Sequence, residues 1–89
     1  MADNENELIE FPCHFPIKVI GKMSDEFSSI VITIINRHVE NFDATKIEMR
    51  GSSNGKYISL TCNVFVETKE QLDKIYIDLS GHPQTQFVI

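Results

Sequence analysis

The feature that most constrains this chain is a segment of strict alternation in its second half. From residue 57 to residue 66, apolar side chains alternate with mostly polar ones. A period of two residues places successive side chains on opposite faces of a β-strand. The apolar face, which we expect in the core, carries Ile58, Leu60, Cys62, Val64 and Val66. The other face carries Tyr57, Ser59, Thr61, Asn63 and Phe65.

A tight-turn sequence stands directly before this strand. Asn54-Gly55 tolerates the positive φ angles of a type I′ turn, so it predicts a hairpin. The partner strand of the hairpin should cover residues 45–51, with Ile47 and Met49 facing the core. Its outward side chains are charged, which is typical of a strand at the edge of a sheet.

The N-terminal half predicts one strand and one helix. The strand should cover residues 15–23, with Phe15, Ile17 and Val19 inward. Ser24 is a suitable N-cap for the helix that follows. Apolar residues then recur at helical spacing, so the helix should continue to about Glu40.

The C-terminal part predicts a second helix and a last strand. Thr68 and Gln71 fit a capping box, in which each side chain satisfies an amide at the start of the helix. The helix should end near Ser80, with Gly81 as the C′ residue. The last strand should cover residues 84–89.

The order strand, helix, strand, strand, helix, strand predicts an α+β fold. With right-handed crossovers it gives the ferredoxin-like βαββαβ sandwich. This fold is a four-stranded antiparallel sheet of order 4-1-3-2 with two helices on one face. Residues 11–89 should form this single domain, and residues 1–10 an acidic, flexible N-terminal tail.

Charge and composition exclude several classes of protein. The net charge is −5, but Asp3, Glu5, Glu7 and Glu10 supply four of these charges, and the chain from Phe11 onward is nearly neutral. Nonspecific binding to nucleic acid or to an anionic membrane needs clustered Lys and Arg, so it is not expected. The chain starts without the basic and apolar segments of a signal peptide, and it has no apolar run of bilayer length. We therefore expect a cytoplasmic protein in which Cys13 and Cys62 are free thiols.

Three segments carry a likeness to a known family. They are Phe11-Pro12 with Phe15 and residues 18–21, then Arg37-His38, and then residues 52–61 followed by Gln71, Tyr76 and Leu79. In these segments the chain resembles the YbeD-like (UPF0250) family of small bacterial proteins of unknown function. The resemblance implies a ferredoxin-like fold and a likeness to the ACT-type regulatory domains, which sense small ligands. It implies no established activity.

The polar face of the sheet is the candidate surface for a ligand or a partner. No predicted element covers this face, and its aromatic residues make it more apolar than a solvated face requires. A second copy of the chain, another protein and a small ligand are the alternatives for covering it. The surface consists of Lys18, Ile20, Tyr57, Ser59, Thr61, Asn63 and Phe65.

The hairpin turn is a second candidate site, for an anion. Successive turn amides can form an anion nest, and basic side chains flank this turn. The alternative is that Ser, Asn and Gly occur here because a tight turn needs them, with the hydroxyls bonded to local backbone. The candidate residues are Arg50, Ser52, Ser53, Asn54, Gly55 and Lys56.

The sequence contains no recognisable motif for catalysis or for binding a cofactor. The His and Cys residues lack metal-ligand spacing, and Cys13-His14 is not a positioned nucleophile and base. Ser59 and Thr61 stand where RNA-binding sheets of this topology carry stacking aromatics, so RNA binding is a less favoured alternative. We expect no enzyme, no cofactor and no metal. The sequence predicts a regulatory or interaction module, either an ACT-like ligand sensor or an adaptor that binds a protein partner or itself as a homodimer.

Overall fold

A computed structural model describes residues 10–89 of the chain, and its elements follow in the predicted order. The predicted acidic tail, apart from its last residue, lies outside the described residues. The helices are α1 (Phe27–Asn36) and α2 (Lys69–Ser80), and a 3-10 turn, η2 (Ala44–Lys46), precedes β2. The strands are β1 (Cys13–Lys22), β2 (Ile47–Gly51), β3 (Tyr57–Val66) and β4 (Thr85–Val88).

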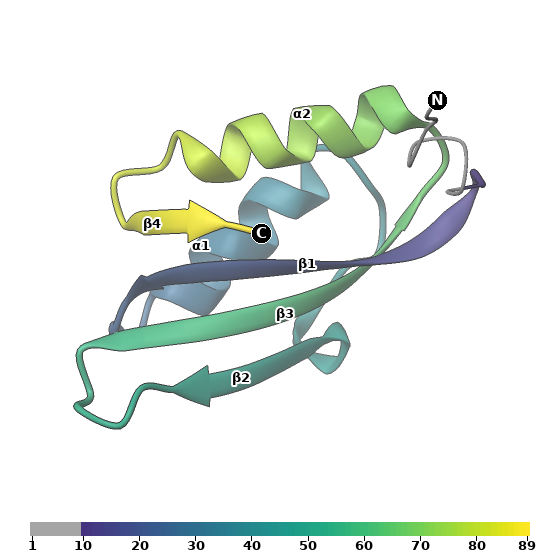
Figure 1. Ribbon diagram of the computed structural model, residues 1–89. Coiled ribbons are helices and arrows are strands. Elements are labelled where there is room, and N and C mark those ends of the chain that lie inside the picture. Colours follow the sequence, from purple (N-terminus) through teal and green to yellow (C-terminus); the bar gives the residue numbers. More distant parts are fainter. Residues whose placement is uncertain (1–9) are drawn as a thin grey trace, which may run out of the picture.

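The strands form one antiparallel sheet of order β2-β3-β1-β4, which is the predicted order read from the other edge. β1 and β3 are central, and β2 and β4 are the edges. Figure 1 shows α1 behind the strands and α2 along the β4 margin, and none of the described elements lies in front of the sheet. The prediction of an α+β, ferredoxin-like βαββαβ fold is confirmed.

The core lies between the sheet and the helices, and its side chains are all apolar. The predicted inward residues of β3 are buried, as are Ile17 and Val19 of β1, while Phe15 is half-buried. This agreement follows from the alternation, because a strand has no other way to bury every second side chain. The helices contribute Phe27, Val31, Ile34, Ile35, Leu72, Ile75 and Leu79.

Helix α1 is shorter at both ends than predicted. Its N-cap is Glu26, which makes no side-chain capping bond. The Ser24 hydroxyl, in the turn before the helix, accepts a hydrogen bond from the Glu26 amide. The helix ends at Asn36 rather than near Glu40. The Asn36 side chain bonds both the amide and the carbonyl of Phe42, at 3.1 Å and 2.8 Å. Asn41 has a φ of 65°. These local bonds turn the chain away from the helix axis.

Strand β2 starts later than predicted, and one of its inward residues is not covered. Residues 44–46 form η2 instead, whose cap is Asp43, with its carboxylate accepting the Thr45 amide. Met49 pairs with Leu60 on the helix side of the sheet, but 58% of its surface is exposed. Figure 1 shows the helices on the β1–β4 side of the molecule and β2 at the opposite margin. The prediction that Met49 enters the core was therefore wrong.

Helix α2 begins as predicted and ends with a different cap. The Thr68 hydroxyl accepts a hydrogen bond from the Gln71 amide at 3.1 Å. The Gln71 side chain accepts the amide of Glu67 rather than that of the cap residue itself, at 2.7 Å. Gly81 is the C-cap residue with a φ of −80°, so the predicted C′ position was wrong by one residue.

The predicted bounds of β1 and β4 differ from the structure by one to two residues. β1 begins at Cys13, two residues before the predicted start, because it pairs with β3 over its whole length. β4 covers Thr85–Val88 rather than residues 84–89, and its pairing with β1 contains a register shift between Ile20 and Gly21. Both differences concern strand ends and leave the topology unchanged.

Candidate functional site

The structure gathers the predicted ligand or partner surface on one face of the sheet. Lys18 and Ile20 of β1 lie opposite Thr61 and Ser59 of β3. Their sequence neighbours on both strands are buried, so these side chains project from the other face. We call this surface, which carries no described cover, the open face. Tyr57, Asn63 and Phe65 lie on it as predicted.

Strand β4 adds two large apolar side chains that the sequence analysis did not place there. Phe87 pairs with Ile20, and Ile89 exchanges backbone hydrogen bonds with Lys18 at 2.8 and 3.1 Å. The exposed fractions are 41% for Tyr57, 54% for Phe87 and 62% for Ile89. The alternation in residues 84–89 was a usable signal. Its assignment to a face needed the register shift beside Gly21, which the sequence does not reveal.

The charges around this apolar group are mostly positive. Arg50 and Glu48 of β2 lie opposite Ser59 and Thr61, so both project from the open face. The other charged side chains there are Lys18 and Lys22 of β1. β1 and β2 thus place three basic side chains and one acidic side chain on the open face, although the net charge of the chain is −5. None of the ion pairs found within residues 10–89 uses any of them.

The open face is hollowed only shallowly between these groups. A hollow of about 230 Å³ lies over Ile20, Tyr57 and Ser59, with Lys18 and Arg50 on its rim. A neighbouring hollow of about 500 Å³ is lined almost wholly by polar side chains. Small-molecule sites are usually deeper and predominantly apolar. The face is therefore better shaped for a broad contact than for engulfing a ligand.

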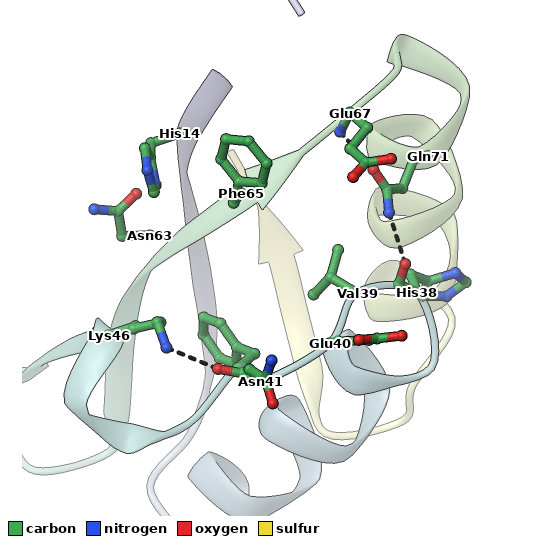
Figure 2. A pocket seen from close by; sticks show the side chains of 11 residues that line it. His14, His38, Val39, Glu40, Asn41, Lys46, Asn63, Phe65, Glu67 and Gln71 are labelled. Atoms are coloured by element: carbon green, nitrogen blue, oxygen red, sulfur yellow. Dashed lines mark hydrogen bonds between the residues drawn. The ribbon is translucent and has the colours of Figure 1, made fainter. Parts of the chain in front are cut away.

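A larger pocket lies at the far end of β3, beside the loop that follows α1. Its volume is about 530 Å³, and Figure 2 shows Phe65 and Glu67 across the gap from Val39 and Asn41. Lys46 closes one side and donates to the Asn41 carbonyl at 2.7 Å. The sequence analysis missed this pocket, because its walls come from β3, α2 and the loop after α1, which meet only in the folded chain.

On the other side of this pocket, a side chain joins the two helices. Gln71 of α2 donates to the His38 carbonyl at 2.7 Å, just beyond the end of α1. The pocket carries carboxylates on Glu40 and Glu67 against the one ammonium of Lys46. Mixed charges of this kind give it no clear preference for an anionic or a cationic ligand.

The hairpin loop has a different geometry from the predicted type I′ turn. Within the Asn54-Gly55 pair, only Gly55 has a positive φ, of 74°. The Asn54 carboxamide oxygen accepts the Lys56 amide at 3.0 Å and the Ser52 hydroxyl at 2.7 Å. The Tyr57 amide donates to the Ser52 hydroxyl, and the Gly55 amide to the Ser52 carbonyl. These local bonds account for Ser52, Asn54 and Gly55. Anion binding by residues 50–56 stays a prediction.

Cys13 and Cys62 are free thiols, as predicted, and Cys62 and the histidine side chains each lie in a structural setting. Cys62 is fully buried, and burial raises the pKa of its thiol to about 12, so it stays protonated. His14 lies against the ring of Phe65, with centroids 5.0 Å apart. His38 donates to the Asp78 carboxylate at 2.9 Å, and His82 accepts the Gln84 amide. Within residues 10–89, no cluster of these residue types has metal-binding geometry.

Comparison with known sequences now decides the family. Residues 6–89 match the sequence model of a family described as "Protein of unknown function (DUF493)". The chain belongs to this family. It is 42% identical to a UPF0250 protein of Paraburkholderia phytofirmans over 89 residues, which is the whole of both chains. It is 41% identical to UPF0250 protein NE1487 of Nitrosomonas europaea, covering 96% of this chain and 98% of the relative. The resemblance to the UPF0250 proteins is confirmed.

A solved structure of the same fold supports the architecture. The solution structure of protein HP0495 from H. pylori matches with a TM-score of 0.76 and 20% sequence identity. The match covers 91% of this chain and 85% of HP0495. At this identity the likeness bears on the fold alone. Neither the DUF493 description nor these relatives' names carries an activity.

The helices of the described part are both too short to cross a bilayer. Neither α1 nor α2 provides a span of the length and apolarity that a membrane requires.

Proposed function

We propose that this DUF493 protein is a non-catalytic interaction module, which docks the open face of its sheet on an apolar, acidic-rimmed patch of another protein. The observation that carries the proposal is the exposed group of Tyr57, Phe87 and Ile89 around Ile20. Single exposed apolar residues are normal on a protein surface. Adjacent ones on one face are typical of interaction sites.

The aromatic residues of the open face suit this role. Tyr57 and Phe87 offer large contact areas at a low cost in side-chain entropy, which is why such residues dominate the energetics of interfaces. Burying either ring further contributes roughly 25 cal/mol for each Å² of apolar surface removed from water. The strands hold both rings in place before any partner arrives.

The charges of the open face define the partner further. Lys18, Lys22 and Arg50 lie around the apolar group, and Glu48 is the acidic side chain that β1, β2 and β3 place on the same face. Complementary potentials speed association and exclude wrong partners more than they add affinity. A partner with Asp or Glu at the rim of an apolar patch fits this arrangement. Because exposed pairs are screened by salt, association should slow as ionic strength rises.

Site-specific photocrosslinking in cells tests this proposal. A photoreactive phenylalanine analogue replaces Phe87 in one variant and Ile77 in the control, since Ile77 is 72% exposed on α2. We expect a discrete adduct with a second protein from position 87 and none from position 77. Adding Lys18→Glu should reduce the yield of the adduct. No adduct, or equal labelling at both positions, would contradict the proposal. An adduct of twice the chain mass would assign the face to a second copy.

The hollow over Ile20 and Tyr57 favours one second candidate, the sensing of a small ligand. Lys18 and Arg50 on its rim suit a carboxylate group, and the apolar floor suits a short hydrocarbon body. Binding to the native state alone raises stability by about 2.7 kcal/mol at a ligand concentration of one hundred times Kd. Thermal melts with a panel of amino acids and short carboxylic acids test it. A saturable rise that Arg50→Gln removes supports sensing, and no rise across the panel argues against it.

A further inference from the structure

The outer edge of β2 combines free backbone groups with charges that are complementary to themselves. Within residues 10–89, β2 pairs only with β3, and Figure 1 shows no element beyond its other side. We propose that two copies of this chain pair antiparallel through the outer edges of β2, around a two-fold axis at Met49. The occupant of this edge is thus a second copy of the chain. The inference does not depend on the proposed function of the open face.

The backbone of β2 offers a short ladder on this side. The hairpin places Ser52 opposite Tyr57, where the Ser52 amide donates to the Tyr57 carbonyl at 2.9 Å. Bonding alternates along antiparallel strands, so Arg50 and Glu48 direct their backbone groups toward β3. Met49 and Gly51 then direct theirs outward. The Ile47 carbonyl also points outward, while its amide is already bonded to Ala44 within η2.

A two-fold axis at Met49 satisfies these outward groups. Each Met49 exchanges both backbone hydrogen bonds with its symmetry mate. Each Gly51 amide donates to the Ile47 carbonyl of the other copy. An isologous interface of this kind uses the same patch on both subunits and closes as a dimer. It joins the two sheets into one eight-stranded sheet.

The side chains match in the same register. On the open face, Glu48 of each copy lies directly opposite Arg50 of the other, which is a favourable cross-strand pair. On the helix side, the exposed Met49 meets its symmetry mate. Ile47 of one copy lies opposite Gly51 of the other. Gly51 has no side chain there, and Met23 fills the space, with its terminal methyl 3.3 Å from an ideal Cβ position on Gly51.

Other registers bring like charges together. A shift of two residues one way places Arg50 opposite its own mate, and the other way places Glu48 opposite its own mate. Parallel pairing through the same edge turns the two open faces to opposite sides of the joined sheet, so Glu48 and Arg50 do not meet their counterparts. A shift of one residue turns the side chains to the wrong faces. Charged side chains normally keep sheet edges apart. Here the same charges select one antiparallel register.

A charge-swap cycle on the full chain tests the pairing. Sedimentation over a range of concentrations should show a reversible dimer of the unmodified chain. Arg50→Glu places two carboxylates opposite each other twice, and Glu48→Arg does the same with two cations. Each single reversal should weaken dimerisation by about ten-fold or more. The double variant Glu48→Arg with Arg50→Glu restores opposite charges and should restore the dimer. Lys74→Glu, exposed on α2, is the control and should change nothing.

The outcomes separate this interface from the open face. A monomer at all concentrations overturns the pairing, and so does a double variant as weak as the single ones. A dimer that Phe87→Ser abolishes and Arg50→Glu leaves intact would place the contact on the open face instead. Amide exchange gives a second readout. The Met49 amide should exchange more slowly as the protein concentration rises, and the Ser53 amide at the hairpin tip should not.

Discussion

Gly21 is the residue of β1 with the least room for a side chain. It is buried where β1 passes α1 and the start of β4. A Cβ placed there would overlap the ring of Phe27 and would lie 2.7 Å from the Gln84 carbonyl oxygen. The space next to Gly21 is therefore filled by the ring of Phe27 from α1 and by the backbone that leads into β4.

Replacing Gly21 by alanine should destabilise the fold by about 1–3 kcal/mol, because the added methyl group forces packed neighbours apart. Urea unfolding of the two chains measures the difference in the free energy of unfolding. Gly51→Ala is the matched control, since its methyl would meet only the flexible end of Met23. Equal losses in the two variants would contradict the packing argument.

Asp78 joins the two helices through a titratable contact. His38 donates to its carboxylate at 2.9 Å, and Arg37 lies at 3.4 Å. The hydrogen bond from His38, aided by the charge of Arg37, holds the pKa of Asp78 below its ordinary value. A carboxyl group with a lowered folded-state pKa stabilises the protein above its unfolded-state pKa. That contribution is lost as the pH falls through the folded-state pKa.

Asp78→Asn should therefore lower the free energy of unfolding at pH 6, by less than about 1 kcal/mol because the carboxylate is partly exposed. The difference from the unmodified chain should shrink as the pH falls below about 4, where an unfolded-state aspartate also takes up its proton. Urea unfolding from pH 3 to pH 6 measures it. A difference that stays constant over this range would exclude the lowered pKa as its source.

For single residues, the sequence predicts which face of the sheet a side chain occupies better than it predicts whether that side chain is buried. The alternation placed Ile17, Val19 and Leu60 correctly, because each is surrounded by the sheet and the helices. Met49 has the same pattern, yet it is exposed, because the helix layer does not extend to β2. Phe87 was missed for the opposite reason. Its face follows from a register shift, and that shift depends on how β4 meets Gly21.

At the scale of the elements, Gln71 connects the start of α2 with the end of α1. Its side-chain oxygen accepts the Glu67 amide, and its nitrogen donates to the His38 carbonyl. The capping pattern in the sequence predicted the position of the helix. It did not predict the second bond, because the loop after α1 reaches Gln71 only in the folded chain.

Gln71→Ala should cost about 1–2 kcal/mol of stability, since it leaves two partly covered backbone groups without this partner. It should also speed amide exchange at Val39, which lies next to the lost contact. Thermal unfolding and hydrogen exchange measure the two effects. Lys74→Ala, an exposed change on the same helix, provides the control. Unchanged exchange at Val39 would show that Gln71 acts on its own helix alone.

At the scale of the whole molecule, topology was predictable and function was not. The order of the elements and the handedness rule were enough to select one sheet order, and that order was confirmed. The open face followed from the same reasoning. Its apolar side chains from β4 and its shallow hollows did not, because they depend on distant segments meeting. The identity of a partner depends on another molecule altogether.

The place of β1 between β3 and β4 also has a consequence in time. The β2–β3 hairpin closes through a short local loop, so its cost in chain entropy is small. β1 has no partner strand close in sequence, because β3 and β4 both follow it at a large distance along the chain. During synthesis Ile17 and Val19 must therefore wait, unburied, until β3 emerges. Pulse-labelled hydrogen exchange during refolding should show Ser59 protected before Lys18, whose amide bonds to Ile89. β1 is thus synthesised first, but we expect it to complete its pairing in the sheet late.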